Sequence, residues 1–469
     1  MASEKSDTTR GEETVSGLER ADTPSSLSGD QERRLLRKLD LRLLPGLVIL
    51  YLLSFLDRSN VANARLEGLT DDLHMTGNQY LTSLTLYFVG YVLFEIPCNI
   101  ILKLTTPKIW LPTLTLLWGV VATLMGLPQN MAGFFVVRFF LGVTESGLFP
   151  GVVYYLTGAF GGILAFGIGK MAGVADLRGW RWIFIIEGLV TVVVSLAAYL
   201  FIHNYPSTAT FLTPKERDTI EHRLTADSDA TAAESFNWEN VSKCLKDPKC
   251  WLYGLSFHTL SLPLYTLSLF LPTIIKDLGY TAANAQLLSV PPYALATTLT
   301  LLVAIYSQRF SLRAPFMIGS SIFAMIGYII LMTNKNPTQR PGVSYVGTFF
   351  AAGGIYPATA LALSWPAMNV AGQTKRATAC AMQISVGNLG AVLGTQLYRP
   401  ITSPRYLLGH GFALGYLAAN AVVTATLWII LRKENRRKAE LLASGARDGK
   451  GKESEPMKGD EDPRWKFHL

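Results

Sequence analysis

The chain is a succession of apolar runs, each about twenty residues long and separated by short polar connections. The hydrocarbon core of a bilayer is about 30 Å thick, and an α-helix rises about 1.5 Å per residue, so a helix of this length crosses the core once. The composition agrees, because 49% of the residues are hydrophobic, only 16% are charged, and the mean hydropathy is +0.28. The sequence therefore predicts an all-α, multi-pass membrane protein.

The runs fall into two sets of six, so about twelve spans are expected. The first set lies at residues 43–64, 80–102, 110–127, 131–156, 157–175 and 179–202, and the second at 251–275, 287–306, 315–332, 344–366, 377–398 and 412–431. The pattern G-[LI]-[FY]-P occurs at residues 147–150, in the fourth run, and again at 354–357, in the tenth. The repeated pattern indicates two six-helix halves that are parallel repeats, with a binding site between them.

The polar segments divide the chain further. We expect a disordered tail over residues 1–38, an N-terminal helical bundle over 39–203, a linker over 204–249, a C-terminal bundle over 250–433 and a disordered tail over 434–469. Lysine and arginine gather before the first run, between the eighth and ninth, between the tenth and eleventh, and after the twelfth. The positive-inside rule then predicts that both tails and the linker are cytosolic.

Charged residues inside apolar runs are costly and usually mark a transport pathway. Arg138 and Glu145 are seven residues apart in the fourth run, so they share a helix face about 10 Å apart. Asp57 and Arg58 lie near the end of the first run, and depth counting puts Asp57 level with Arg138. We therefore expect Asp57 to meet Arg138 and Glu145 to couple protons, while Arg58 is free to bind an anionic substrate. The alternative is a structural ion-pair network that locks the two helices together.

Several polar residues are weaker candidates for substrate contacts. Asn63 adds to the polar residues at the end of the first run, Tyr87 lies in the second, and Asn388 lies in the eleventh. His258 and Tyr265 share a face of the seventh run, although a single histidine there is more often a core residue than a ligand. Glu187, near the start of the sixth run, is interpreted as structural or interfacial.

Other classes of function find no support in the sequence. The basic residues flank apolar runs instead of forming a stripe, so nucleic acid is not an expected partner. No P-loop, G-x-S-x-G motif or metal-ligand spacing occurs, and the four cysteines form no framework, so we expect no enzyme activity, no cofactor and no metal.

The chain resembles the major facilitator superfamily, and within it the anion:cation symporter branch with the fungal allantoate permease-like and nicotinate permease-like transporters. The resemblance covers about residues 39–433 and is carried by LSFLDRSNVANA, YFVGYVLFEIPCNIILK, RFFLGVTESGLFPGVVYYL, GWRWIFIIEG, YTAANAQLLSVPPY and TKRATACAMQISVGNLGAVLG. It implies a plasma-membrane, monomeric carrier of a small organic anion such as a vitamin-like carboxylate or a ureide, driven by protons through alternating access. It also implies proton-coupling and anion-binding roles for Asp57, Arg58, Arg138 and Glu145. A sugar or drug transporter of the same superfamily is disfavoured, because the motifs typical of those branches are not evident.

Two departures from the family pattern stand out. Gln308 occupies a position where the family usually has an aspartate in the loop after the eighth span. The resemblance also implies that about two dozen family positions are absent where Leu156, Thr157 and Gly158 join the fourth and fifth runs directly, so both spans should be shortened. A skipped exon or a mispredicted gene model would explain the junction. An alternative function follows from it, namely a non-transporting sensor or a defective isoform.

Overall fold

The computed structural model describes residues 29–147, 174–202, 209, 211–220, 238–447 and 459–469. Within these ranges every regular element is a helix, as the apolar runs predict. The expected fifth span and the junction at Leu156 lie outside the described residues, so their predicted shortening stays a prediction.

The helices form two bundles. The N-terminal bundle contains α1 (Gly29–Leu66), α2 (Leu69–Asp72), α3 (Gly77–Leu104), α4 (Pro107–Leu124), α5 (Met131–Glu145) and α7 (Gly179–Phe201), with the short η1 (Val174–Asp176) before α7. The C-terminal bundle contains α10 (Pro248–Asp277), α11 (Ala282–Leu288), α12 (Val290–Arg309), α13 (Ala314–Thr333), α14 (Pro341–Asn369), α15 (Gln373–Gly394) and α16 (Leu407–Arg447). The remaining elements are the linker helix α9 (Trp238–Lys246) and the short helices η3 (Pro400–Thr402) and η4 (Gly459–Glu461).

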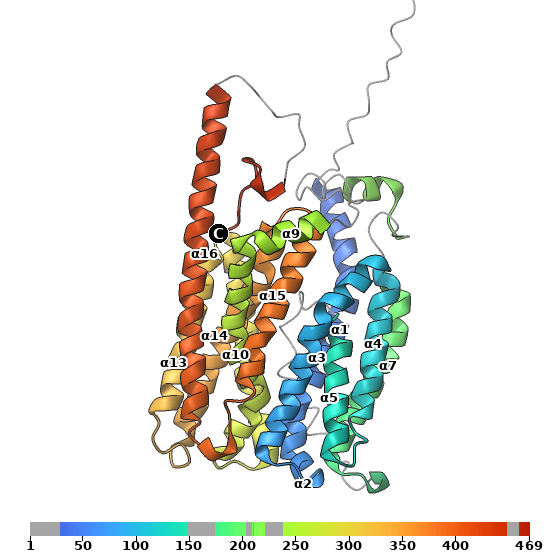
Figure 1. The fold of residues 1–469 in the computed structure, drawn as a ribbon, viewed down its shortest axis with the longest axis vertical. Helices are drawn as coiled ribbons and strands as arrows, with labels where there is room; N and C mark the ends of the chain where they lie inside the picture. Colours follow the sequence, from blue (N-terminus) through green and yellow to red (C-terminus); the bar gives the residue numbers. More distant parts are fainter. Residues whose placement is uncertain (1–28, 148–173, 203–208, 210, 221–237, 448–458) are drawn as a thin grey trace, which may run out of the picture.

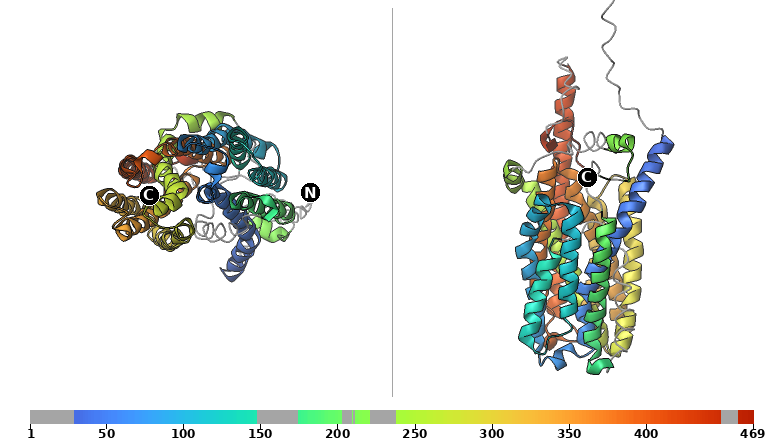
Figure 2. Two further views of the ribbon diagram at one scale, coloured as in Figure 1. Left: turned by 90° about the horizontal axis from the view of Figure 1, so that it is seen from below. Right: turned by 90° about the vertical axis from the view of Figure 1, so that its right-hand side faces the viewer.

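The two bundles stand side by side with their long axes roughly parallel (Figure 1), and the views in Figure 2 show the same division. Helix α9 lies across one end of the molecule, where α1 also begins and α16 ends. We call this the linker end and the opposite end, which carries α2, the far end. Contacts between the bundles run through α3 with α15 and through α1 with α10.

Local sequence signals set where the site-bearing helices begin. Thr76 and Gln79 form a capping box at the start of α3, each satisfying a backbone N–H of the other. At the start of α5 the Oδ1 atom of Asn130 accepts from the N–H of Gly133 at 2.9 Å. These caps fix the positions along the chain at which α3 and α5 enter the bundle.

Eight helices in the described part of the chain are long and apolar enough to cross a membrane: α4, α7, α10, α11 with α12, α13, α14, α15 and α16. Helices α1, α3 and α5 are not among them, and they carry the charged residues that the sequence marked. Each nevertheless covers most of an expected span, so the described helices match eleven of the twelve predicted runs.

The ends of the chain differ from the expectation. Helix α1 begins at Gly29 and not near residue 39, and α16 continues to Arg447, where a disordered tail from residue 434 was expected. Ion pairs one turn apart support this extension, between Arg436 and Glu440 and between Arg437 and Glu434. Residues 459–469 are also ordered and packed against the C-terminal bundle, because Trp465 and Phe467 bury their side chains there.

Candidate functional site

The buried carboxyl group of Glu145, at the end of α5, is the centre of the candidate site. Its Oε1 atom accepts from the Nη2 atom of Arg58 at 2.6 Å and from the hydroxyl of Ser54. Its Oε2 atom accepts from the hydroxyl of Tyr87 at 2.6 Å. The side chain is 1% exposed, so this carboxyl group is held by α1 and α3 away from bulk solvent.

Arg58 connects this cluster to the other bundle. Its Nη1 atom donates to the hydroxyl of Tyr265, on α10, at 2.7 Å. The rings of Tyr87, Tyr91 and Tyr265 lie 5.3 to 5.4 Å from the guanidinium carbon, within the range of cation–π attraction. Sequence reasoning expected Arg58 to be free for a substrate, but the guanidinium is paired with Glu145. Its Nε atom has no hydrogen-bond partner among the described residues.

Arg138 lies on α5, about two helical turns before Glu145. It is fully buried, its Nε atom donates to the carbonyl of Ser83 at 3.4 Å, and its guanidinium carbon lies 5.1 Å from the centre of the Tyr87 ring. The Nη1 atom has no hydrogen-bond partner, and no carboxylate in the described part of the chain forms a salt bridge with Arg138. A buried cation without an anionic partner is costly, so its presence calls for a function.

The expected pairing of Asp57 with Arg138 differs from what the structure shows. The hydroxyl of Thr191, on α7, donates to Asp57 at 3.4 Å, and Asp57 faces α7. The physical reason is the helical turn of about 100° between adjacent residues. Once Arg58 points toward Glu145 and the other bundle, Asp57 must point to a different side of α1.

Asn63 also lies on the α7 side of α1. Its amide nitrogen contacts the Oδ1 atom of Asn60 at 3.5 Å, while the amide of Asn60 donates to Glu187. Asp57, Asn60 and Asn63 are spaced by three residues and so follow one face of the helix. Asn63 is therefore not part of the cluster around Glu145, and Glu187 has the interhelical contact expected of a structural residue.

The candidates in the C-terminal bundle do not reach the cluster either. The Nδ1 atom of His258 is 3.0 Å from the carbonyl of Val386, and its Nε2 atom is 3.4 Å from the hydroxyl of Tyr416. His258 thus has core partners on α15 and α16. Asn388 is buried, and in the part of the chain that the structure describes its Oδ1 atom has no hydrogen-bond partner. Among the sequence-predicted or described polar residues of that bundle, Tyr265 is the one whose contact with Arg58 is seen.

A close approach of α3 and α5 sets the position of Tyr87 beside Glu145. A β-carbon on Gly142 would overlap the carbonyl oxygen of Tyr87, and one on Gly90 would overlap the carbonyl oxygen of Phe139. Glycine at both positions lets the two backbones pack directly against each other. Residues 87 and 145 are thereby brought within hydrogen-bond distance.

Sequence reasoning missed Ser54 and did not give Tyr265 a role. Ser54 precedes Arg58 by four residues, so the two share a face of α1, and this spacing could have predicted it. The spacing of Tyr265 from His258 placed it on a polar face, but no pattern in the chain tells which helix that face meets.

The far end of the molecule carries further hydrogen bonds between the bundles. The hydroxyl of Thr85 lies 2.8 Å from that of Thr395, and the amide of Gln396 donates to Thr85 at 2.6 Å. The amide of Gln286 donates to Glu67 at 3.2 Å. Together with Arg58 and Tyr265, these contacts close the bundles against each other from the middle of the molecule to the far end.

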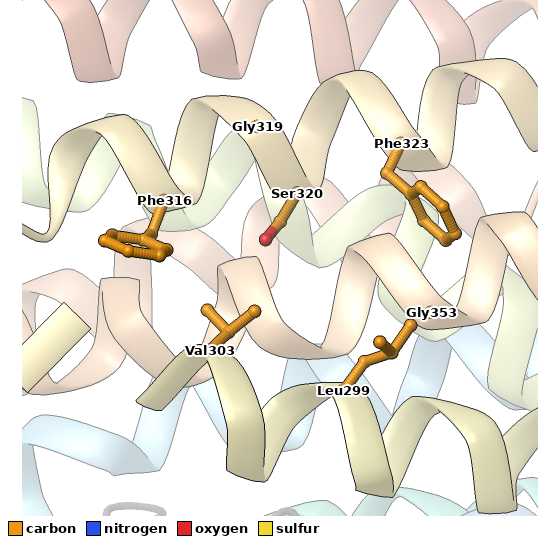
Figure 3. Close-up of a pocket in the computed structure, with 7 residues that line it drawn as sticks. All are labelled: Leu299, Val303, Phe316, Gly319, Ser320, Phe323 and Gly353. Carbon is orange, nitrogen blue, oxygen red and sulfur yellow. The ribbon is translucent and has the colours of Figure 1, made fainter. Parts of the chain in front are cut away.

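An apolar pocket of about 250 Å³ lies elsewhere, among α12, α13 and α14 (Figure 3). Its lining consists of Leu299, Val303, Phe316, Gly319, Ser320, Phe323 and Gly353. With one hydroxyl and no charged side chain, it does not suit an anion. No group of three or more histidine, cysteine, aspartate or glutamate side chains in the described ranges could hold a metal ion.

Comparisons with known proteins show which family the chain is similar to. Residues 47–395 match the model of the Major Facilitator Superfamily. The chain is 35% identical to the MFS-type transporter cnsO of Penicillium expansum, over 94% of this chain and 92% of that protein. It is 30% identical to the high-affinity nicotinic acid transporter of Saccharomyces cerevisiae, over 89% of this chain and 81% of that protein.

Two solved structures share the fold. One is a bacterial homolog of the human lysosomal transporter Spinster in an inward-facing, occupied conformation, with a TM-score of 0.59 and 14% identity over 86% of this chain and 97% of that one. The other is the proton:xylose symporter XylE bound to 6-bromo-6-deoxy-D-glucose, with a TM-score of 0.62 and 14% identity over 82% of this chain and 94% of that one.

Proposed function

Because the chain belongs to the major facilitator superfamily and is a secondary transporter, not an enzyme, we propose that it carries a small organic anion together with protons. The observation that carries this proposal is the buried ion pair between Arg58 and Glu145 at the contact between the bundles. Binding sites of such transporters lie between the two repeats, near the middle of the membrane.

The proposed substrate is a small carboxylate. The guanidinium of Arg58 can donate two parallel hydrogen bonds to a carboxylate, and the three tyrosine rings around it provide flat apolar surfaces for a ring or a short carbon skeleton. The likeness to a nicotinic acid transporter supports a vitamin-like carboxylate, and an allantoate-like ureide has the same charge and a similar size.

The proposed coupling is a competition for Arg58. While Glu145 is ionised it holds Arg58 at 2.6 Å, and a substrate carboxylate must displace it. Protonation removes the negative charge of Glu145 and releases the guanidinium to bind the anion. When Glu145 loses its proton on the other side of the membrane, it recaptures Arg58 and the anion leaves. Proton and substrate then move in the same direction.

Arg138 and Asp57 complete the proposed machinery. Arg138 supplies a second buried positive charge without a carboxylate partner in the described residues, which would attract an anion toward the cluster. Asp57 is 3% exposed and accepts from the hydroxyl of Thr191, and within the described residues it forms no salt bridge that a change of protonation would break.

We further propose that the protein lies in the plasma membrane and that its linker end faces the cytosol. Clusters of basic residues before the first span and after the last support this orientation. The far end, which the contacts of Thr85 and Glu67 close, would then be the outer side. This conformation would therefore exchange substrate with the cytosol.

The experiment is uptake of labelled nicotinate and allantoate into proteoliposomes with an imposed proton gradient. We expect accumulation that an uncoupler abolishes. Glu145→Gln should retain exchange of labelled for unlabelled substrate but lose accumulation driven by protons, whereas Glu239→Gln, on the exposed surface of α9, should behave as the unsubstituted protein. Full accumulation by the Glu145→Gln protein would overturn the coupling role.

The alternative of a sensor or defective isoform depends on the junction at Leu156, outside the described residues. Sequencing the transcript across residues 156–158 distinguishes it. A transcript that contains about two dozen further codons there would remove the reason for this alternative, whereas a confirmed junction with no exchange activity would favour it.

A further inference from the structure

The segment of residues 459–469 returns to the linker end of the C-terminal bundle and packs onto it, visible as the short red segment beside α16 in Figure 1. It begins with η4 and continues as Asp-Pro-Arg-Trp-Lys-Phe-His-Leu. The side chains of Trp465 and Phe467 are 8% and 2% exposed, which is unusual for aromatic residues in so polar a part of the chain. The segment is therefore folded against a specific surface.

Two buried lysines bind the first part of the segment. The Nζ atom of Lys375, at the start of α15, is 2.8 Å from both carboxylate oxygens of Asp460. Lys375 also reaches Asp247, the cap of α10, at 3.3 Å. Lys438, on α16, is 2% exposed and donates to the main-chain carbonyls of Asp460 and Trp465. Without the segment, both ammonium groups would lose most of these acceptors.

Two asparagine side chains bind the backbone of the last residues. Asn435, on α16, donates to the carbonyl of Phe467 at 2.9 Å and accepts from its N–H at 2.8 Å. Asn369, at the end of α14, does the same for His468, at 3.0 and 2.7 Å. A side-chain amide that pairs with both the N–H and the C=O of one residue imitates a neighbouring β-strand. Consecutive residues of the segment are thus held from two different helices.

Further contacts involve the ring of Phe467 and the main chain. The Nζ atoms of Lys438 and Lys249 lie 4.4 and 5.7 Å from the centre of the ring. The indole of Trp365 donates to the carbonyl of His468 at 2.9 Å, and the N–H of Arg313 donates to the carbonyl of Leu469. One short segment therefore contacts α10, α14, α15 and α16 and the residue that caps α13, all at the linker end of the C-terminal bundle.

We propose that the linker end of the C-terminal bundle is a peptide-binding site whose ligand is the chain's own acidic and aromatic segment, residues 459–469, which we call the clasp. By contacting these five helices at once, the clasp holds them in one arrangement. The bundle can then move as a single body when the two bundles rock against each other, as alternating access requires. This inference does not depend on the identity of the substrate or on proton coupling.

The test compares the full-length protein with Asp460→Lys, which sets a cation against Lys375. Chymotrypsin can cut after Trp465 and Phe467 only when the clasp leaves its site, because both side chains are buried while it is docked, so we expect removal of the chain end to be at least tenfold faster in this variant. Glu461→Lys, an exposed neighbour with the same change of charge, should be cut at the rate of the unsubstituted protein. Equal rates for all three proteins would overturn the proposal.

A second measurement keeps the test independent of folding defects. A labelled synthetic peptide of residues 459–469 should bind the vacated site of the Asp460→Lys protein at least tenfold more tightly than the occupied site of the unsubstituted protein. Hydrogen exchange at residues 309–316 and 366–376 should accelerate in the variant, and the added peptide should reverse the change. If the clasp is released while exchange at these helix ends stays unchanged, the segment binds without holding the bundle together, and the proposal is refuted.

Discussion

The Nη1 atom of Arg58 donates a hydrogen bond of 2.7 Å to the hydroxyl of Tyr265, and this contact joins α1 of the N-terminal bundle to α10 of the C-terminal bundle. The same guanidinium holds Glu145 through its other terminal nitrogen. The side chain of Arg58 therefore connects Glu145, to which we assign proton coupling, with the contact to Tyr265, which must change when the two bundles move against each other.

Substitutions at these two positions should differ in severity. Tyr265→Phe removes one hydrogen bond to a charged group, worth about 1.5–3 kcal/mol, so we expect substrate affinity to fall roughly ten- to a hundredfold. Arg58→Lys removes the planar fork and should abolish measurable binding. Equilibrium binding of labelled substrate checks both, with the exposed Arg399→Lys as control. Unchanged affinity in Arg58→Lys would refute the substrate-binding role.

Replacing Arg138 by methionine separates function from stability. A buried guanidinium that lacks a carboxylate partner in the described part of the chain costs folding free energy, so we expect Arg138→Met to raise the thermal midpoint or leave it unchanged. Substrate uptake should nevertheless be lost. Thermal melting in detergent and proteoliposome uptake measure the two effects. A destabilised variant that still transports would show that Arg138 has a structural role only.

Gly142→Ala should weaken the packing that places Tyr87. The new methyl group would overlap the carbonyl of Tyr87, and overpacking of this kind costs about 1–3 kcal/mol. Gly415→Ala, on α16, is the matched control, since no atom lies within 4 Å of a β-carbon there. The control should be neutral or gain up to about 1 kcal/mol from better helix propensity. Equal melting temperatures would contradict the close approach of α3 and α5.

Clasp binding should weaken in acid because of His468. Partial burial, and then the positive charges of Arg313, which caps α13, and Lys466 in the clasp, hold the pKa of His468 below its usual value. The neighbours on α14, Trp365 and Asn369, are neutral. A lowered pKa means that the docked state favours the neutral ring, so docking is complete above about pH 6.5 and is lost progressively as the pH falls toward the lower pKa of the docked state.

A fluorophore on Glu461→Cys reports this, because the four native cysteines are buried. Its anisotropy should fall as the pH is lowered below about 6.5. Combining it with His468→Gln should flatten the profile over this range. The same fall in that combination would assign the pH dependence to other groups.

The helices were largely predictable because apolar runs of membrane length leave few alternatives. The end of α16 and the packed clasp were not predictable. The last part of α16 is charged and so has no hydrophobic periodicity, and the clasp is bound largely through hydrogen bonds to its main chain, which do not depend on its side chains. The pair of aromatic residues at 465 and 467 in a polar tail was the available signal. Asparagine side chains that pair with a main chain leave no pattern in the sequence of either partner.

The burial of the charged residues in the candidate site was predictable, but their partners were not. Burial of Arg58, Arg138 and Glu145 follows from their places in apolar runs. Whether Asp57 or Arg58 faces the other bundle depends on the rotation of α1 about its axis, which is set by packing against α7 and α10. Depth along a helix can be counted from a sequence, whereas its rotation cannot when polar residues occur on several faces.

The ion pair between Arg58 and Glu145 also means that a substrate carboxylate competes for Arg58 with a carboxylate of the same molecule. Such an intramolecular competitor acts at a fixed effective concentration, commonly in the millimolar range for short tethers, whatever the substrate concentration. The measured dissociation constant is then the intrinsic one divided by the fraction of molecules whose arginine is free. Affinities measured at different pH values would therefore depend on competition from Glu145 as much as on the intrinsic affinity of the site for the substrate.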